Sequence, residues 1–157
     1  MDTKPPFTII AIDHLGLAPR DPRQALKFFT IILGLSSLGS EAVASEGVNV
    51  AMVASHHTPA STPMGPTPFP LHKLELLEAQ SSTSPIASFV EKKGGGIHHI
   101  AFRVDNIRAA AAYLKQQGVL LINNEPRAGA HGSEILFVHP KSTGGILVEL
   151  VAQRQPT

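Results

Sequence analysis

The sequence predicts an α+β protein built from two βαβββ modules that follow one another along the chain. Two observations carry this prediction. A strand followed by a helix occurs twice, and each of these strands bears a histidine, His14 in the first copy and His99 in the second. Each copy is followed later by an apolar strand that contains a glutamate, Glu75 and Glu149 respectively. One histidine and one glutamate are therefore repeated at matching places within a single chain.

The second copy has the clearer pattern. We expect a strand over Ile97–Val104, and from His99 onward its apolar residues alternate with other residues, which is typical of a strand with one apolar face that packs under a helix. His99 lies on the other face of this strand. Asp105 or Asn106 can cap the helix that follows, which we expect over Ile107–Gln117 because its alanine-rich sequence favours a helix and a glycine ends it.

The first copy has the same order of signals. We expect a strand over Ile9–Ala18 that places His14 on one face and leucines on the other. A helix follows over Pro22–Ile32, with proline at its start and Gly34 just beyond its end, which is the usual asymmetry of these two residues.

The rest of the chain completes two modules of one domain, residues 1–157. We place the first module at residues 8–80, a linker with a short helix at 81–96, and the second module at 97–153. A proline-rich loop over His56–Pro70 interrupts the first module, and we interpret Gly94–Gly96 as a flexible connection. The further elements that we expect are strands Leu35–Val43, Val48–Ala54 and Leu71–Leu77, helix Ile86–Lys92, and strands Leu120–Asn123, Glu134–His139 and Gly145–Val151.

Composition restricts the possible functions. The chain has 157 residues, 43% of them hydrophobic and 16% charged, so it can bury a core. The net charge of +1 and the absence of a basic run give no reason to expect a nucleic-acid partner, and the apolar runs are too short for a membrane partner. There is no cysteine, so histidine and carboxylate are the strong metal ligands that remain. No targeting segment is visible, so we expect a cytoplasmic protein, or a mitochondrial matrix protein if a transit peptide was trimmed.

The four repeated residues predict a metal site. A single histidine on a strand is commonly a core residue, and a glutamate between leucines can lie on the solvent face of its strand. Two such pairs at matching places of a repeat are what a two-fold His₂Glu₂ metal site requires, and imidazole with carboxylate favours a divalent ion. The candidate ligands are His14, Glu75, His99 and Glu149.

Three segments carry a resemblance to a known family. They are IDHLGLAPRD, LELLEAQSSTSPIASFVEKKGGGIHHIAFRVDNI and EPRAGAHGSEILFVHPKSTGGILVELV, which together span most of Ile12–Val151. The chain resembles the vicinal oxygen chelate (glyoxalase/bleomycin-resistance) superfamily and, within it, the methylmalonyl-CoA epimerase family. This resemblance implies a curled mixed sheet formed by paired βαβββ modules around a metal site.

The resemblance also implies which residues bind the metal. Carried over residue by residue, the family ligands correspond to the same four residues, and in some members the position of Glu75 is a glutamine. Strand parity selects His99 rather than His98, which we interpret as either a supporting hydrogen-bond partner or an inert surface residue. We expect Co²⁺ first among the ions, with Mn²⁺, Ni²⁺, Zn²⁺ and Fe²⁺ as alternatives.

The implied reaction is the epimerisation of (2R)- and (2S)-methylmalonyl-CoA through a metal-stabilised enolate, which needs one proton-transfer group on each face of the substrate. Some members carry an acid on the strand after a Gly-Val turn, but Val50 occupies the corresponding position here. Glu149 is our first candidate for a catalytic base and Glu75 the second, with Glu46 a weaker third.

Weaker signals concern the substrate and the partners. His131, Lys141 and Ser142 match family loops near the substrate, and Lys141 is either a contact for a carboxylate or CoA phosphate or an ordinary surface lysine. We expect an acyl-CoA as the small-molecule partner and a homodimer as the assembly. Two rival functions remain: a glyoxalase-I-like isomerase or lyase with the same fold, and a metal-free protein of this fold that binds small molecules.

Overall fold

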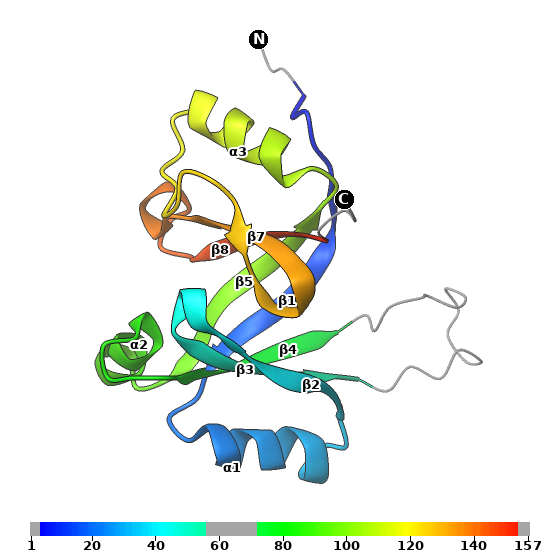
Figure 1. Cartoon of the computed structure of the whole chain (residues 1–157), viewed down its shortest axis with the longest axis vertical. Helices are drawn as coiled ribbons and strands as arrows, with labels where there is room; N and C mark the ends of the chain where they lie inside the picture. The colour runs from blue at the N-terminus through cyan, green and yellow to red at the C-terminus, as the bar shows by residue number, and fades with distance from the viewer. Residues whose placement is uncertain (1–3, 56–71, 154–157) are drawn as a thin grey trace, which may run out of the picture. The chain divides into compact units, whose positions relative to one another are not determined.

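The computed structural model describes residues 4–55 and 72–153, and the chain divides into two compact units (Figure 1). The central unit comprises His14–His98, and the terminal unit comprises Met1–Asp13 together with His99–Thr157. The divisions fall inside two strands, β1 (Ile9–Ala18) and β5 (Gly96–Val104). The boundaries at residues 8–80, 81–96 and 97–153 stay a prediction, and the predicted loop at His56–Pro70 lies outside the described residues.

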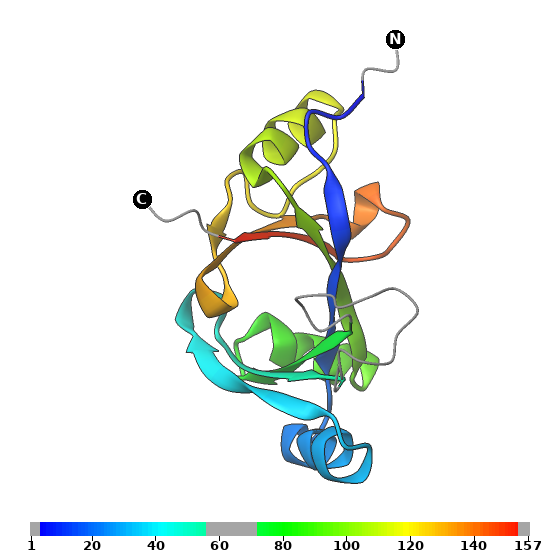
Figure 2. The same ribbon diagram turned by 90° about the vertical axis from the view of Figure 1, so that its right-hand side faces the viewer.

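The central unit contains four strands in the order β2-β3-β4-β1. β1 runs parallel to β4, and the other neighbours are antiparallel. The helix α1 lies against one face of this sheet (Figure 2). The elements of the unit beyond β1 are α1 (Pro22–Lys27) with a π-helical turn at Phe28–Ile32, β2 (Ser36–Val43), a 3₁₀ turn at Ala44–Glu46, β3 (Val48–Ala54), β4 (Lys73–Ala79) and α2 (Pro85–Lys93).

The terminal unit repeats the parallel pairing with β5 and β8, in the strand order β5-β8-β7-β6. Asn106 is the cap of its helix, because the Asn106 side chain accepts a hydrogen bond from the backbone of Ala109. Asp105 instead accepts the backbone N–H of Thr8 at 2.8 Å, which holds the pKa of Asp105 below its ordinary value. The elements after β5 are α3 (Ile107–Gln116), β6 (Arg127–Ala128), 3₁₀ turns at Ala130–Gly132 and Pro140–Ser142, β7 (Ser133–Val138) and β8 (Val148–Gln153).

The predicted fold class is confirmed, because each half has the order βαβββ and a short helix lies between the halves. None of the helices in residues 4–55 and 72–153 is long and apolar enough to span a membrane.

One predicted strand, Leu120–Asn123, is wrong. This segment makes a single bridge, between Leu121 and Val138. The strand that pairs with β7 on the side away from β8 is the two-residue β6 instead. Two asparagines and Pro126 follow the apolar residues, and proline has no N–H to continue a ladder, so the extended pairing stops early.

The interpretation of Gly94–Gly96 as a flexible connection stays a prediction, and the structure shows what the glycines do locally. Gly94 ends α2 in the left-handed conformation, with its N–H on the carbonyl of Val90. A Cβ on Gly95 would lie 3.0 Å from the carbonyl oxygen of Ala18, and its φ is +88°, so both the space and the backbone conformation favour glycine at this position.

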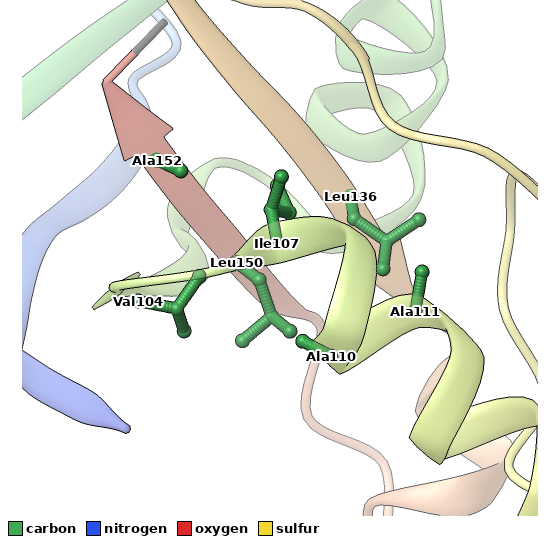
Figure 3. Packing of buried hydrophobic residues seen from close by; sticks show 7 residues of the cluster. All are labelled: Val104, Ile107, Ala110, Ala111, Leu136, Leu150 and Ala152. Atoms are coloured by element: carbon green, nitrogen blue, oxygen red, sulfur yellow. The ribbon is translucent and has the colours of Figure 1, made fainter. Parts of the chain in front are cut away.

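The core of the terminal unit lies between α3 and one face of its sheet (Figure 3). As predicted, the apolar face of β5 packs under the helix: Val104 belongs to the core, and Phe102 packs against it. The buried residues of the cluster are Val104, Ile107, Ala110, Ala111, Leu136, Leu150 and Ala152. The other face of β5, which bears His99 and Ala101, is not part of this cluster.

Leu136 provides the first prediction. It is 0% exposed and lies in this cluster, so Leu136→Ala removes buried methyl groups and leaves a cavity. We expect the free energy of unfolding to fall by about 2–5 kcal/mol in urea denaturation. Leu120→Ala is the matched control, because Leu120 is 53% exposed, and its effect is expected to stay within about 0.5 kcal/mol. Equal effects of the two substitutions would contradict this packing.

Candidate functional site

The central unit holds the first predicted histidine and glutamate together. β1 and β4 are parallel, and the Cα of Gly16 lies opposite that of Glu75. His14 is two residues before Gly16 and therefore points to the same face of the sheet as Glu75. The His14 Nε2 atom is 3.4 Å from the Glu75 Oε2 atom, and both side chains are buried.

The terminal unit holds the second pair in the same geometry. β5 and β8 are parallel, and Ala101 lies opposite Glu149. His99 is two residues before Ala101, as His14 is two residues before Gly16. The His99 Nε2 atom is again 3.4 Å from the Glu149 Oε2 atom, and this pair is also buried.

The two pairs have the chemistry of metal ligands. A buried carboxylate is costly unless it meets a cation or hydrogen-bond donors, and a sheet interior would otherwise favour an apolar residue. Imidazole nitrogen and carboxylate oxygen each bind a divalent ion such as zinc at about 2.0–2.2 Å, so two ligands of one ion lie about 3 Å apart. A separation of 3.4 Å within each pair fits that requirement. His14, His99 and Glu149 are accordingly residues that can hold a metal ion.

Aromatic packing positions the second histidine. The ring of Phe137 meets the His99 imidazole edge to face, with the ring centres 5.7 Å apart. Phe137 lies opposite Glu149 in the β7–β8 ladder, so it flanks both members of the pair. The guanidinium of Arg127 lies 6.0 Å from the centre of the Phe137 ring. Neither Phe137 nor Arg127 is among the residues predicted from the sequence, although the alternation of β7 places Phe137 on the Glu149 face.

Asp13, the residue before His14, forms a buried ion pair with Arg103 of β5. Arg103 donates to the Asp13 carboxylate through Nε at 2.8 Å and Nη2 at 2.6 Å. The Asp13 side chain is 4% exposed and the Arg103 side chain 19%. The sequence assigns no role to Arg103 or Asp13, because strand alternation does not show which charges meet across strands.

The remaining predicted residues occupy varied places. His98 packs edge to face on Phe89 of α2, which is a structural contact. His131 adopts a left-handed backbone conformation in its turn, with φ of 53°. Lys141 is exposed, and the Ser142 hydroxyl accepts the backbone N–H of Leu120 at 2.9 Å. Whether His131, Lys141 and Ser142 contact a substrate stays a prediction.

Val50 and Glu46 lie on or next to β3, where some family members carry an acid. Val50 lies two residues before Met52 on β3, and Met52 is opposite Glu75, so Val50 is on the Glu75 face but is apolar. Glu46 lies in the turn before β3.

Comparison with known proteins defines the family. The model of the Glyoxalase/Bleomycin resistance protein/Dioxygenase superfamily matches residues 13–137, and the chain belongs to this superfamily.

Similar proteins narrow the class further. The human mitochondrial methylmalonyl-CoA epimerase is 37% identical over 88% of this chain and 72% of its own length. A solved methylmalonyl-CoA epimerase in complex with methylmalonyl-CoA and NH₄⁺ is 33% identical, with a TM-score of 0.81 over 93% of this chain and 96% of the other. A variant of the Streptomyces coelicolor methylmalonyl-CoA epimerase with bound 2-nitronate-propionyl-CoA is also 33% identical, with a TM-score of 0.81 over 94% and 100% of the two chains. The fold predicted from the resemblance is thereby confirmed.

The Asp13–Arg103 pair yields the second prediction. Arg103→Met would leave the buried Asp13 carboxylate without its cation, so we expect a loss of about 3–5 kcal/mol in the free energy of unfolding. The matched control is Arg108→Met, because Arg108 makes an ion pair of similar length, 2.7 Å, with Glu134 but is 68% exposed. Its expected cost in the same urea titration is at most about 1 kcal/mol. A cost for Arg103→Met no larger than for Arg108→Met would show that burial does not govern this pair.

Proposed function

We propose that this protein is an enzyme that epimerises (2R)- and (2S)-methylmalonyl-CoA. The observation that carries the proposal is the duplicated His–Glu pair, with the same 3.4 Å contact in both halves, in a chain similar to methylmalonyl-CoA epimerases. The substrate class is an acyl-CoA, in keeping with the ligand of the similar solved enzyme.

The residues that would hold the metal are His14, Glu75, His99 and Glu149. They form a set of two neutral nitrogen donors and two anionic oxygen donors, which suits a divalent first-row ion. We expect one ion to take ligands from both pairs, with Co²⁺ the first choice and Mn²⁺, Ni²⁺, Zn²⁺ and Fe²⁺ the others. When bound, such an ion polarises the thioester carbonyl and stabilises the enolate that forms when the α-proton leaves.

The chain's own groups must move the α-proton. Glu149 is the first candidate, because its carboxylate is buried, where water competes little for the proton, and Glu75 is the second. His131, Lys141 and Ser142 are proposed to contact the carboxylate or the CoA of the substrate. The homodimer expected from the resemblance is also part of this proposal.

The third prediction tests the reaction. The purified protein is incubated in D₂O with (2R)- or (2S)-methylmalonyl-CoA, with added Co²⁺ or with a chelator. We expect Co²⁺-dependent incorporation of deuterium at the α-carbon, followed by NMR or mass spectrometry, together with conversion between the two epimers. In the presence of the chelator, both the deuterium incorporation and the conversion between epimers are expected to be lost.

Two outcomes would count against the proposal. The assay is repeated with Mn²⁺, Ni²⁺, Zn²⁺ and Fe²⁺ in place of Co²⁺. Absence of exchange with all five ions would exclude an epimerase. Metal-dependent isomerisation of a glutathione hemithioacetal, measured in parallel and without exchange of methylmalonyl-CoA, would support the glyoxalase-like alternative instead.

A further inference from the structure

The match between the two halves extends to a third position, where the residues differ. Each strand that carries a glutamate has an antiparallel neighbour, β3 beside β4 and β7 beside β8. Met52 of β3 lies opposite Glu75, and Phe137 of β7 lies opposite Glu149. Directly opposed residues of antiparallel strands point to the same face, so each of these side chains flanks its glutamate. The equivalent place therefore holds a flexible thioether in the central unit and an aromatic ring in the terminal unit.

The Phe137 ring reaches across β8 to the histidine of the second pair. β5 and β7 lie on either side of β8, so their backbones are about 10 Å apart. The imidazole of His99 and the phenyl ring of Phe137 nevertheless meet edge to face, with their centres 5.7 Å apart and an angle of 86° between their planes. The two rings therefore lean toward each other over the strand that carries Glu149.

Neighbouring groups hold the Phe137 ring in place. The ring packs against a buried apolar cluster on the same face of the sheet, and the Arg127 guanidinium lies 6.0 Å from the ring centre, a distance suited to a cation–π contact. Arg127 is opposite Ile135, two residues before Phe137, and so shares this face. The cluster consists of Ala101, Ile135 and Val151. The ring is thus fixed independently of the histidine.

A fixed ring restricts the histidine. The torsion that turns an imidazole about its Cβ–Cγ bond is broad, so a rotamer alone does not set the direction of the ring nitrogens. Edge-to-face packing on Phe137 favours one plane for the His99 ring, and in that plane Nε2 lies 3.4 Å from the Glu149 Oε2 atom. Met52 cannot orient His14 in this way, because an unbranched methionine side chain has three rotatable bonds and adapts to its neighbours.

We propose that Phe137 is a positioning residue that orients His99 for metal binding, so that the terminal His–Glu pair is pre-organised in a way that the central pair is not. This inference rests on the proposed function, which makes His99 a metal ligand. A ligand whose orientation is fixed during folding loses little conformational freedom when it binds, so removal of the ring should weaken metal binding. Groups that orient metal ligands usually contribute about 10–100-fold to metal affinity.

Phe137→Leu tests this role, because leucine keeps an apolar side chain but removes the ring, and Phe137→Tyr restores the ring. Phe102→Leu is the matched control: Phe102 is also a half-buried phenylalanine of the terminal sheet, but it packs against the cluster under α3 on the other face. Met52→Leu changes the equivalent position of the central unit. Each protein is measured for Co²⁺ affinity by calorimetry, for the visible absorption of bound Co²⁺, for the His99 proton signals by NMR without metal, and for its urea midpoint.

We expect Phe137→Leu to bind Co²⁺ about 10–100-fold more weakly than the wild type and to change the visible absorption of the ion. The imidazole proton signals of His99 should shift in this metal-free variant, because the ring current of Phe137 is lost. Phe137→Tyr and Met52→Leu should each bind Co²⁺ within a few-fold of the wild-type affinity. Loss of a packed ring should lower the urea midpoint in both phenylalanine-to-leucine variants, but Phe102→Leu should keep the wild-type Co²⁺ affinity, Co²⁺ absorption and His99 signals.

Other results would overturn the role of Phe137. Wild-type Co²⁺ affinity in Phe137→Leu would exclude it. An equal loss of affinity in Phe102→Leu would indicate a general effect of lower stability, and a loss in Phe137→Tyr as large as in Phe137→Leu would show that the ring is not the cause. An equal loss in Met52→Leu would show that the two pairs do not differ.

Failure of the proposed function is distinguishable from failure of this inference. A wild-type protein that binds Co²⁺ but exchanges neither epimer would contradict the proposed reaction, while the Co²⁺ affinities of the variants would still decide the role of Phe137. A wild-type protein that binds no Co²⁺ would contradict the metal site and, with it, the role of Phe137.

Discussion

Each half of the chain buries a glutamate carboxylate beside a histidine. An isolated buried carboxylate is destabilising among apolar side chains of a sheet. Two such pairs with the same 3.4 Å contact are difficult to explain by packing alone. A cation shared by the ligands removes this cost, so the metal, when bound, is expected to contribute to stability as well as to the reaction.

Parallel strand pairing makes the repeated geometry possible. In each half, the strand with the histidine runs beside the strand with the glutamate, and the glutamate lies opposite the residue two positions after the histidine. A shift of one residue would turn the glutamate to the other face and destroy the pair. The residues opposite Glu75 and Glu149 are small, Gly16 and Ala101 respectively. Their side chains therefore leave space for the imidazole and the carboxylate of each pair. α3 fills the other face of the sheet in the terminal unit and helps to fix this register (Figure 3).

Much of the fold, and the strand face on which each of the four residues lies, could be predicted because both depend on local alternation. The period of two selected His99 over His98, and the structure places His99 against Glu149 and His98 against Phe89. Contacts that depend on which strands become neighbours could not be predicted in this way: the Asp13–Arg103 pair and the Phe137 ring beside His99. The prediction of a strand at Leu120–Asn123 is wrong for a related reason, since apolar residues alone do not show where a ladder ends.

We propose that the two His–Glu pairs supply ligands to one and the same ion. The most direct measurement is the stoichiometry and affinity of Co²⁺ for the wild type and for the His14→Ala and His99→Ala variants, by calorimetry and elemental analysis. We expect one ion per chain in the wild type and a loss of most of the Co²⁺ affinity in either variant. Two ions per chain, or undiminished binding after removal of either histidine, would contradict it.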